Sequence, residues 1–220
     1  MLSPDVLETP SRRRFLMGAA MAAIGWAIPI VPGHRVRSRS ATVLIPATKT
    51  PAHLMPRLLP RAMAALDVHS DRVTHRDIVG IVDFAEASRT PRFHLLDIAG
   101  GAVTTHLVAH GSGSDPDSSG WVERLSNEPD SNVSSRGAFV TGETYLGKHG
   151  RSRRLIGLDR ENSMAESRGI VIHAASYVSA AMAAAQGRIG RSQGCFAVAE
   201  GVIVEVLERL GPGPLILAWK

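Results

Sequence analysis

Short runs of apolar residues, several of them rich in β-branched side chains, recur through the chain and predict strands. Glycine, proline and polar residues bound these runs, which is typical of strands joined by turns. Gly100 and Gly101 separate two of the runs, so we expect those two strands to form a hairpin. The strands that we predict cover residues 78–84, 92–98, 102–109, 137–141, 153–158, 169–173 and 214–219.

Three other segments have apolar residues at the spacing of a helix. Residues 53–66 contain two prolines, so we expect an irregular helix there, packed at the edge of the domain. Residues 177–186 are rich in alanine and end at Gly187, a residue type that commonly terminates helices. Residues 199–210 place their apolar side chains on one stripe and precede Gly211 and a proline, which predicts a further helix.

Length and composition are those of one ordinary globular domain. The chain has 220 residues, of which 44% are hydrophobic and 20% charged. Residues 111–137 are polar and rich in Ser, Gly, Asp and Asn, which indicates a long loop of the kind that is functional or mobile. We therefore predict a compact, strand-dominated α+β domain with its clearest helices late in the chain.

The net charge is concentrated at the start of the chain. The formal charge is +5, but residues 1–40 carry +4 and the remaining residues only +1. A nucleic-acid-binding domain needs a basic surface on its folded part. The nearly neutral body therefore argues against a nucleic-acid partner.

The first 40 residues have the pattern of a twin-arginine export signal. Residues 11–16 read SRRRFL, and residues 17–31 form an uninterrupted apolar stretch. These 15 residues fall short of the about 20 that a stable membrane-spanning helix needs, but they suit the hydrophobic region of a signal. The alternative is a chance arginine pair before a buried helix.

Three arginines follow the apolar stretch, at positions 35, 37 and 39, and favour an export route that carries folded proteins. We predict an export signal over residues 1–40, a linker over residues 41–52 and a catalytic domain over residues 53–220. The expected location is the periplasm or an equivalent cell-wall space. We expect no permanent membrane anchor, and a monomer.

Cys195 is the only cysteine, and an unpaired thiol in an exported protein needs an explanation other than an internal disulfide. It lies in the glycine-rich loop 187–195, 22 residues after His173, which ends an apolar strand-like run. A thiol attacks as thiolate, and histidine is the natural base near neutral pH. Gly194 would leave backbone N–H groups free to face a developing oxyanion, and Ser192 is a candidate for setting the loop.

Two arginines of the same loop, Arg188 and Arg191, are candidates for holding a substrate carboxylate. A structural explanation is also open, in which Cys195 is a small buried residue and His173 a core histidine with satisfied hydrogen bonds. The spacing of the two residues does not by itself separate this explanation from catalysis.

Three ordered motifs favour catalysis. They are residues 141–150 (TGETYLGKHG), 170–175 (IVIHAA) and 190–195 (GRSQGC). With these motifs, residues 110–198 resemble the catalytic domain of the murein L,D-transpeptidases, the YkuD-type cysteine enzymes of bacterial cell-wall cross-linking, and in particular a divergent branch of them. The resemblance implies a YkuD-like mixed β-sheet or sandwich with a few packed helices, peptidoglycan stem peptides as donor and acceptor, and no cofactor.

The resemblance also implies a role for each residue of the motifs. Cys195 would attack the carbonyl between the third and fourth residues of a stem, releasing D-alanine, and His173 would act as the base. The main-chain carbonyl of Ala174 would orient the imidazole. The N–H groups of Gly194 and Cys195 would face the oxyanion.

Four further positions, in or beside the motifs, concern the substrate groove. Tyr145 and His149 would line the substrate groove by resemblance, or else belong to a turn with a solvated histidine. Better-known members carry histidine where this chain has Gln193. Proline is expected where Phe196 stands, which puts the shape of the pocket wall in question.

A metal site is not expected. His106 and His110 share one face of a predicted strand, and His94 is near in sequence. However, no third ligand completes a pattern such as H-E-x-x-H.

Three functions fit the sequence. The first and preferred one is an L,D-transpeptidase that joins two third-position residues, or a third-position and a first-position residue, through a cysteine thioester. The second is an L,D-carboxypeptidase, in which water resolves the same thioester. The third is a non-catalytic wall-binding module, in which Cys195 would be unreactive.

Overall fold

The computed structural model describes residues 48–49 and 54–220. The predicted export signal lies outside these residues, and so does most of the predicted linker. Two linker residues form a short strand. Within the described part, none of the helices has the length and apolar composition that a bilayer crossing requires.

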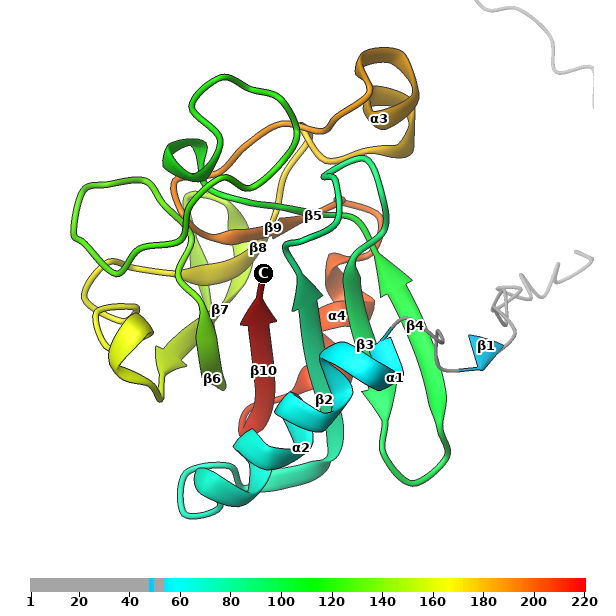
Figure 1. Cartoon of the computed structure of the whole chain (residues 1–220), viewed down its shortest axis with the longest axis vertical. Helices are drawn as coiled ribbons and strands as arrows, with labels where there is room; N and C mark the ends of the chain where they lie inside the picture. Colours follow the sequence, from blue (N-terminus) through cyan, green and yellow to red (C-terminus); the bar gives the residue numbers. More distant parts are fainter. Residues whose placement is uncertain (1–47, 50–53) are drawn as a thin grey trace, which may run out of the picture. The chain divides into compact units, whose positions relative to one another are not determined.

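One mixed sheet organises the described residues (Figure 1). Its strands are β1 (Thr48–Lys49), β2 (His75–Asp83), β3 (Phe93–Asp97), β4 (Ala102–His106), β5 (Val108–Ala109), β6 (Gly137–Gly147), β7 (Gly150–Gly157), β8 (Val171–Ala174), β9 (Phe196–Val198) and β10 (Pro214–Trp219). The strands are ordered β1-β4-β3-β2-β10-β6-β7-β8-β9-β5. The β10–β2 and β8–β9 pairs are parallel, and the other pairs are antiparallel.

The two halves of the sheet share one core. The main apolar cluster joins residues of β2 and β3 with residues of β8 and β9, although these strands are distant in the sheet order. Phe196 at the start of β9 makes edge-on contacts with Phe84 and Phe139, with ring centroids 5.9 and 5.5 Å away. Such contacts hold β9 against the middle strands of the sheet by burying large apolar surfaces. The predicted strand-dominated α+β class is confirmed.

The described residues form the helices α1 (Leu54–Arg57), α2 (Leu59–Val68), α3 (Ala180–Gln186) and α4 (Ile203–Leu210). Two of these four helices, α2 and α4, pack on the sheet, whereas α3 has no buried residue. The predicted irregular helix is divided into α1 and α2, and α2 packs on β2 and β10 through Ala62 and Leu66. The predicted second late helix begins at Ile203, and Val206 and Leu207 bury its stripe in the main core.

The predicted strand over residues 102–109 is in fact two strands. β4 pairs with β3, as the predicted hairpin requires, whereas β5 pairs with β9 at the other end of the sheet. The chain therefore changes partner at Leu107. Strand β9 was not predicted, because three residues are too few to show a period.

The predicted loop over residues 111–137 is irregular apart from one 3-10 turn, Ser112–Ser114, an isolated β-bridge from Gly111 to Ser192, and Gly137, which begins β6. It begins directly after β5, which pairs with the strand that follows Cys195. Hydrogen bonds tie it to the cysteine loop, from Ser112 N to Ser192 O at 2.8 Å and from Ser192 N to His110 O at 2.8 Å. The loop is thus built against the predicted nucleophile.

Candidate active site

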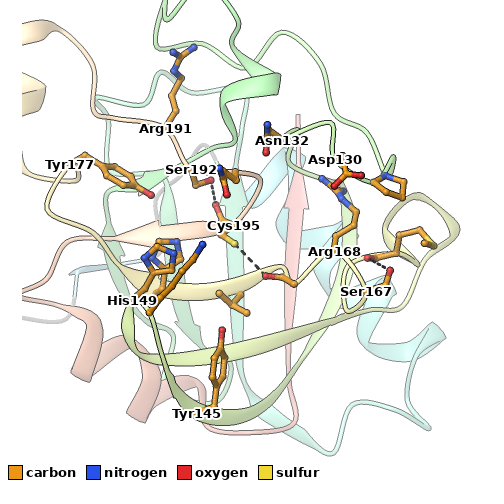
Figure 2. Close-up of a pocket in the computed structure, with 17 residues that line it drawn as sticks. Asp130, Asn132, Tyr145, His149, Ser167, Arg168, Tyr177, Arg191, Ser192 and Cys195 are labelled. Carbon is orange, nitrogen blue, oxygen red and sulfur yellow. Dashed lines mark hydrogen bonds between the residues drawn. The ribbon is translucent and has the colours of Figure 1, made fainter. Parts of the chain in front are cut away.

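Parallel pairing of β8 with β9 brings the predicted nucleophile and base to one face of the sheet. Ile172 is opposite Phe196, and His173 is opposite Ala197. Side chains alternate along a strand, so Cys195, just before β9, points to the same side as His173. Both line one cavity of about 860 Å³ (Figure 2).

The cavity is built from four segments far apart in sequence and from Tyr177, which follows β8. The β6–β7 hairpin forms one side, and part of loop 111–137 forms another. Residues before and within β8 lie between them, and the cysteine loop closes the remaining side. Its lining residues are Pro129, Asp130, Asn132, Tyr145, Lys148, His149, Met164, Ser167, Arg168, Gly169, Val171, His173, Tyr177, Arg191, Ser192, Gln193 and Cys195.

The imidazole of His173 is oriented by its own strand. Its Nδ1–H donates to the carbonyl of Ala174 at 2.9 Å, which leaves Nε2 free to accept a proton. His149 stacks on the ring, with centroids 4.2 Å apart. Burial lowers the pKa of His173, and electrostatic repulsion from the nearby His149 and Lys148 lowers it further, against the opposing effect of the Ala174 carbonyl. The histidine is therefore neutral at pH 7, as a base must be.

The thiol of Cys195 is also neutral at rest. Sγ lies 3.6 Å from the carbonyl of Gly169. Burial raises the pKa of Cys195, and this effect outweighs the N–H of Val171 and the cations Lys148 and Arg168, which favour the thiolate. Because both shifts favour uncharged groups, the geometry suits proton removal during attack rather than a stored thiolate–imidazolium pair.

Ser192 fixes the backbone on which the cysteine stands. Its hydroxyl donates to the carbonyl of Cys195 at 2.7 Å and accepts the N–H of Gly194 at 3.1 Å. The expectation that the Gly194 N–H is free for an oxyanion therefore does not match this geometry, because that N–H already has a partner. Gly194 does not line the cavity but supplies a backbone φ of +106°, where a side chain would be strained.

The cysteine loop also requires a close approach of two backbones. A Cβ on Gly111 would lie 2.8 Å from the nitrogen of Gly194. A Cβ on Gly194 would lie 3.0 Å from both Ile170 Cδ1 and the carbonyl of Val133. Glycine is needed at both positions because the first loop lies directly on the second.

Three buried polar side chains, linked by hydrogen bonds, lie next to this contact. Arg92, fully buried, donates to His110 Nδ1 at 2.7 Å, and His110 Nε2–H donates to Asp115 at 3.2 Å. Burial, with the charge of Arg92, lowers the pKa of His110 to about 4, so the ring is neutral. Burial alone would raise the pKa of Asp115, but hydrogen bonds from Gly120, Ser119 and His110 hold it below its usual value. The carboxylate thus compensates the buried guanidinium.

The remaining predicted site residues are divided between the cavity and its surroundings. Tyr145, His149 and Ser192 line the cavity. Arg191 also lines it, but its guanidinium donates to the carbonyls of Asp115 and Pro116. Figure 2 shows Arg191 extending away from Cys195. Arg191 is therefore held by the loop wall.

Arg188 is not among the residues that line the cavity, so the structure does not place it with the predicted carboxylate-binding group. It packs instead near Gly120, on which a Cβ would lie 2.9 Å from that of Arg188. The sequence position of Arg188 in the glycine-rich loop suggested that it binds a substrate carboxylate, but it does not line the cavity.

Phe196 leaves the cavity wall unaffected. Its side chain is fully buried in the main core, on the opposite side of the strand from Cys195. The question raised by the missing proline therefore concerns the core rather than the pocket. Gln193, in contrast, is exposed and lines the cavity.

The histidines considered for a metal pair have separate partners. Both ring nitrogens of His110 are hydrogen-bonded, to Arg92 and Asp115, and His106 Nε2 lies 3.9 Å from Glu205. No cluster of three potential metal ligands occurs among the residues that the structure describes.

Several cavity residues were missed from the sequence. Arg168 and Lys148 are the cations that influence Cys195, and Asp130, Asn132 and Tyr177 complete the walls. Burial and the nearby thiol raise the pKa of Tyr177 to about 12, so it remains a neutral phenol. The available signal was position, since Lys148 is in the first motif and Arg168 directly precedes an apolar strand.

Comparison with known proteins identifies the class. The family model for the L,D-transpeptidase catalytic domain (YkuD_2) matches residues 51–219. The chain belongs to this family. None of the curated proteins matches the sequence.

Solved structures give a distant likeness. An L,D-transpeptidase from Mycobacterium smegmatis is 13% identical, with a TM-score of 0.41, over 66% of this chain and 59% of that one. L,D-transpeptidase 1 from Mycobacterium tuberculosis is 13% identical, with a TM-score of 0.37, over 66% and 62%. The chain thus spans less than two thirds of the length of these relatives.

The reactivity of Cys195 should show its raised pKa. We expect alkylation by iodoacetamide to accelerate steadily from pH 6 to pH 9, because the rate follows the thiolate fraction. Stopped-flow or mass-spectrometric rates would measure it, with Cys195→Ala as the blank. A rate that is already constant between pH 6 and pH 7 would contradict a neutral resting thiol.

Ser192→Ala should destabilise the protein by about 1–3 kcal/mol, since it leaves the buried N–H of Gly194 without its acceptor. Urea unfolding followed by circular dichroism would measure the change. Ser163→Ala, at an exposed hydroxyl, is the control and should cost less than about 0.5 kcal/mol. Equal losses in the two variants would show that Ser192 has no special role in the loop.

Proposed function

We propose that this chain is an exported cysteine L,D-transpeptidase that cross-links peptidoglycan stem peptides. The observation that carries the proposal is the presence of Cys195 and His173 in one open cavity, with Nδ1 of the imidazole fixed by the Ala174 carbonyl. A structural cysteine and a satisfied core histidine would not need to share a cavity. Membership of the family supports the same class of reaction.

The first half of the reaction forms a thioester. His173 Nε2 takes the Sγ proton while sulfur attacks the carbonyl carbon between the third and fourth residues of the donor stem. The backbone N–H of Cys195 is the proposed donor to the oxyanion, because that of Gly194 is occupied by Ser192. The carbon–nitrogen bond then breaks, and His173 returns the proton to the amine of the departing D-alanine.

The second half transfers the acyl group. An amine of a second stem attacks the thioester carbon, gives a proton to His173 and expels the cysteine thiolate, which then recovers a proton. No metal or redox step is required. The cavity of about 860 Å³ is large enough for extended peptide segments on both sides of the thiol.

The proposed location follows from the proposed substrate. Peptidoglycan lies outside the cytoplasmic membrane, and the twin-arginine pattern over residues 1–40 provides a route to it. The nearly neutral charge of the remaining chain fits a peptide partner rather than nucleic acid.

Hydrolysis is the main alternative, because water and an amine compete for the same thioester. The cavity that contains Cys195 is open to solvent, because exposed residues such as Asp130, Lys148 and Gln193 line it. Water can therefore reach the thioester. An L,D-carboxypeptidase would use the same nucleophile and base. Only the product distinguishes the two.

Acylation by a carbapenem tests whether the thiol is catalytic. We expect one covalent adduct on the wild-type protein in intact-mass spectrometry, none on Cys195→Ala, and at least about 100-fold slower formation on His173→Gln, since the general base is lost. A wild-type protein that stays unmodified would instead indicate a non-catalytic wall-binding module.

Incubation with purified disaccharide-tetrapeptides tests the acceptor. Transfer predicts cross-linked dimers and released D-alanine, detected by liquid chromatography and mass spectrometry. Cys195→Ala is the control and should give neither. Tripeptide products without any dimer would replace the transpeptidase by a carboxypeptidase.

A further inference from the structure

The β6–β7 hairpin brings a second histidine onto the proposed base, and the reaction described above gives it no role. The rings of His149 and His173 stack, with centroids 4.2 Å apart and planes inclined by 23°. His149 is exposed at the tip of the hairpin, whereas His173 is buried, so the outer ring covers one face of the inner ring. Figure 2 shows the ring of His149 within the cavity that Cys195 also lines.

A single hydrogen bond does not fully orient the imidazole of His173. Its Nδ1–H donates to the carbonyl of Ala174 at 2.9 Å, and within the described residues the ring makes no second hydrogen bond. One such contact fixes the position of Nδ1, but the ring can still turn about the line of that bond, since the outer torsion of histidine is broad. A second ring stacked on one face removes this freedom, because turning would drive the two rings into each other. The hydrogen bond and the stack together therefore hold the plane of the ring.

A tight turn holds His149 in place. Gly147 pairs with Gly150, so two residues form the loop, and His149 is the second of them. Gly150 has a φ of +75°, which glycine adopts without strain. A Cβ on Gly147 would lie 2.7 Å from Cε2 of Tyr145, so the tyrosine ring packs directly against the turn.

The hairpin is also joined to the strand that carries the base. Strand β7 pairs with β8, and Arg153 lies opposite Ile172, the residue before His173. The guanidinium of Arg154, the next residue of β7, lies 4.7 Å from the centroid of the Tyr145 ring. That ring thus has one partner at the turn and another on β7. Strand register therefore sets where the two imidazoles meet.

The stacked ring also acts on the charge of the base. Burial is the largest cause of the lowered pKa of His173, and repulsion from His149 and Lys148 adds to it. An imidazolium on one face of the base disfavours a second positive charge there. The titratable and charged groups that line the cavity with His173 are Asp130, Tyr145, Lys148, His149, Arg168, Tyr177, Arg191 and Cys195.

We propose that His149 is a positioning residue, which holds the ring plane of His173 so that Nε2 is directed at the thiol for proton transfer. His149 acts through the base and exchanges no proton with the substrate. This role requires an aromatic face, so another flat ring should replace the imidazole. The inference rests on the proposed function, because it concerns the base of that reaction.

Two substitutions in the full chain separate stacking from the chemistry of an imidazole. With a disaccharide-tetrapeptide donor, we expect His149→Ala to lower kcat about tenfold or more with an unchanged KM, because a misaligned base transfers the proton less often. His149→Phe keeps the aromatic face and should stay within about threefold of the wild-type kcat. The time course of D-alanine release measures both constants.

The pH profile of kcat/KM gives a readout that a purely structural role would not move. The base must be neutral, so activity falls as the pH drops through the pKa of His173. Both variants remove the repulsion from His149, which raises that pKa, so the acid limb should move to higher pH in both. Only His149→Ala should also lose activity on the plateau. An acid limb that stays at the same pH in both variants would overturn the proposal.

Nitrogen-15 NMR reports the orientation of the base directly. We expect a single Nδ1–H tautomer of His173 in the wild-type protein and in His149→Phe, as the bond to the Ala174 carbonyl requires. His149→Ala should show exchange between the two tautomers, because the ring is free to turn. His173→Gln assigns the signal. The same single tautomer in all three proteins would contradict the positioning role.

A matched control comes from the same hairpin. Leu146 is 85% exposed and does not line the cavity, so Leu146→Ala should leave kcat and KM unchanged. An equal loss of kcat in Leu146→Ala would assign the effect to the hairpin as a whole and overturn the proposal. A higher KM with unchanged kcat in His149→Ala would make His149 a substrate contact instead. Equal losses of kcat in His149→Ala and His149→Phe would show that the imidazole itself reacts, which also overturns the proposal.

The positioning role and the proposed function fail in different ways. A His149→Ala variant that releases D-alanine as fast as the wild-type protein would overturn the positioning role and leave the transpeptidase intact. A wild-type thiol that reacts with iodoacetamide but with none of the tetrapeptides would remove both.

Discussion

The parallel pairing of β8 with β9 is the contact on which the site depends. It places His173 opposite Ala197, and the alternation of side chains then brings Cys195 to the same face. A shift of one residue would turn the thiol into the core, where Phe196 now packs against Phe84 and Phe139. The burial of that ring therefore secures the register, and the core and the site are specified by the same three-residue strand.

Polar groups buried behind the site keep the cysteine loop in place. Arg92, His110 and Asp115 form a chain of hydrogen bonds under the loop that begins at Gly111. An unpaired buried charge is costly, so each member restrains the next. The backbone carbonyl of His110 also accepts a hydrogen bond from the N–H of Ser192. The hydroxyl of Ser192 in turn bonds to the backbone of Gly194 and Cys195. The geometry of the cysteine loop thus rests on backbone contacts that any bulkier residue at Gly111 or Gly194 would break.

The electrostatics of the cavity favour a mechanism in which charge appears only during reaction. Burial disfavours both the thiolate of Cys195 and the imidazolium of His173. Lys148 and Arg168 partly offset the effect on the thiolate, and the carbonyl of Ala174 partly offsets the effect on the imidazolium. Lys148, Arg168 and Asp130 line the same cavity as the thiol and the imidazole.

The sequence alone determined the class of fold, most of the strands, the late helices, and the pair Cys195 and His173, because periodicity and short motifs are local properties. It missed β9 and the change of partner at Leu107, since both depend on pairing between distant segments. It also assigned carboxylate binding to Arg188 and Arg191 by their nearness to the cysteine in sequence. Only the tertiary structure showed that Arg168, 27 positions before Cys195, lines the same cavity as the thiol. Strand register and packing, rather than distance along the chain, decide which residues become neighbours.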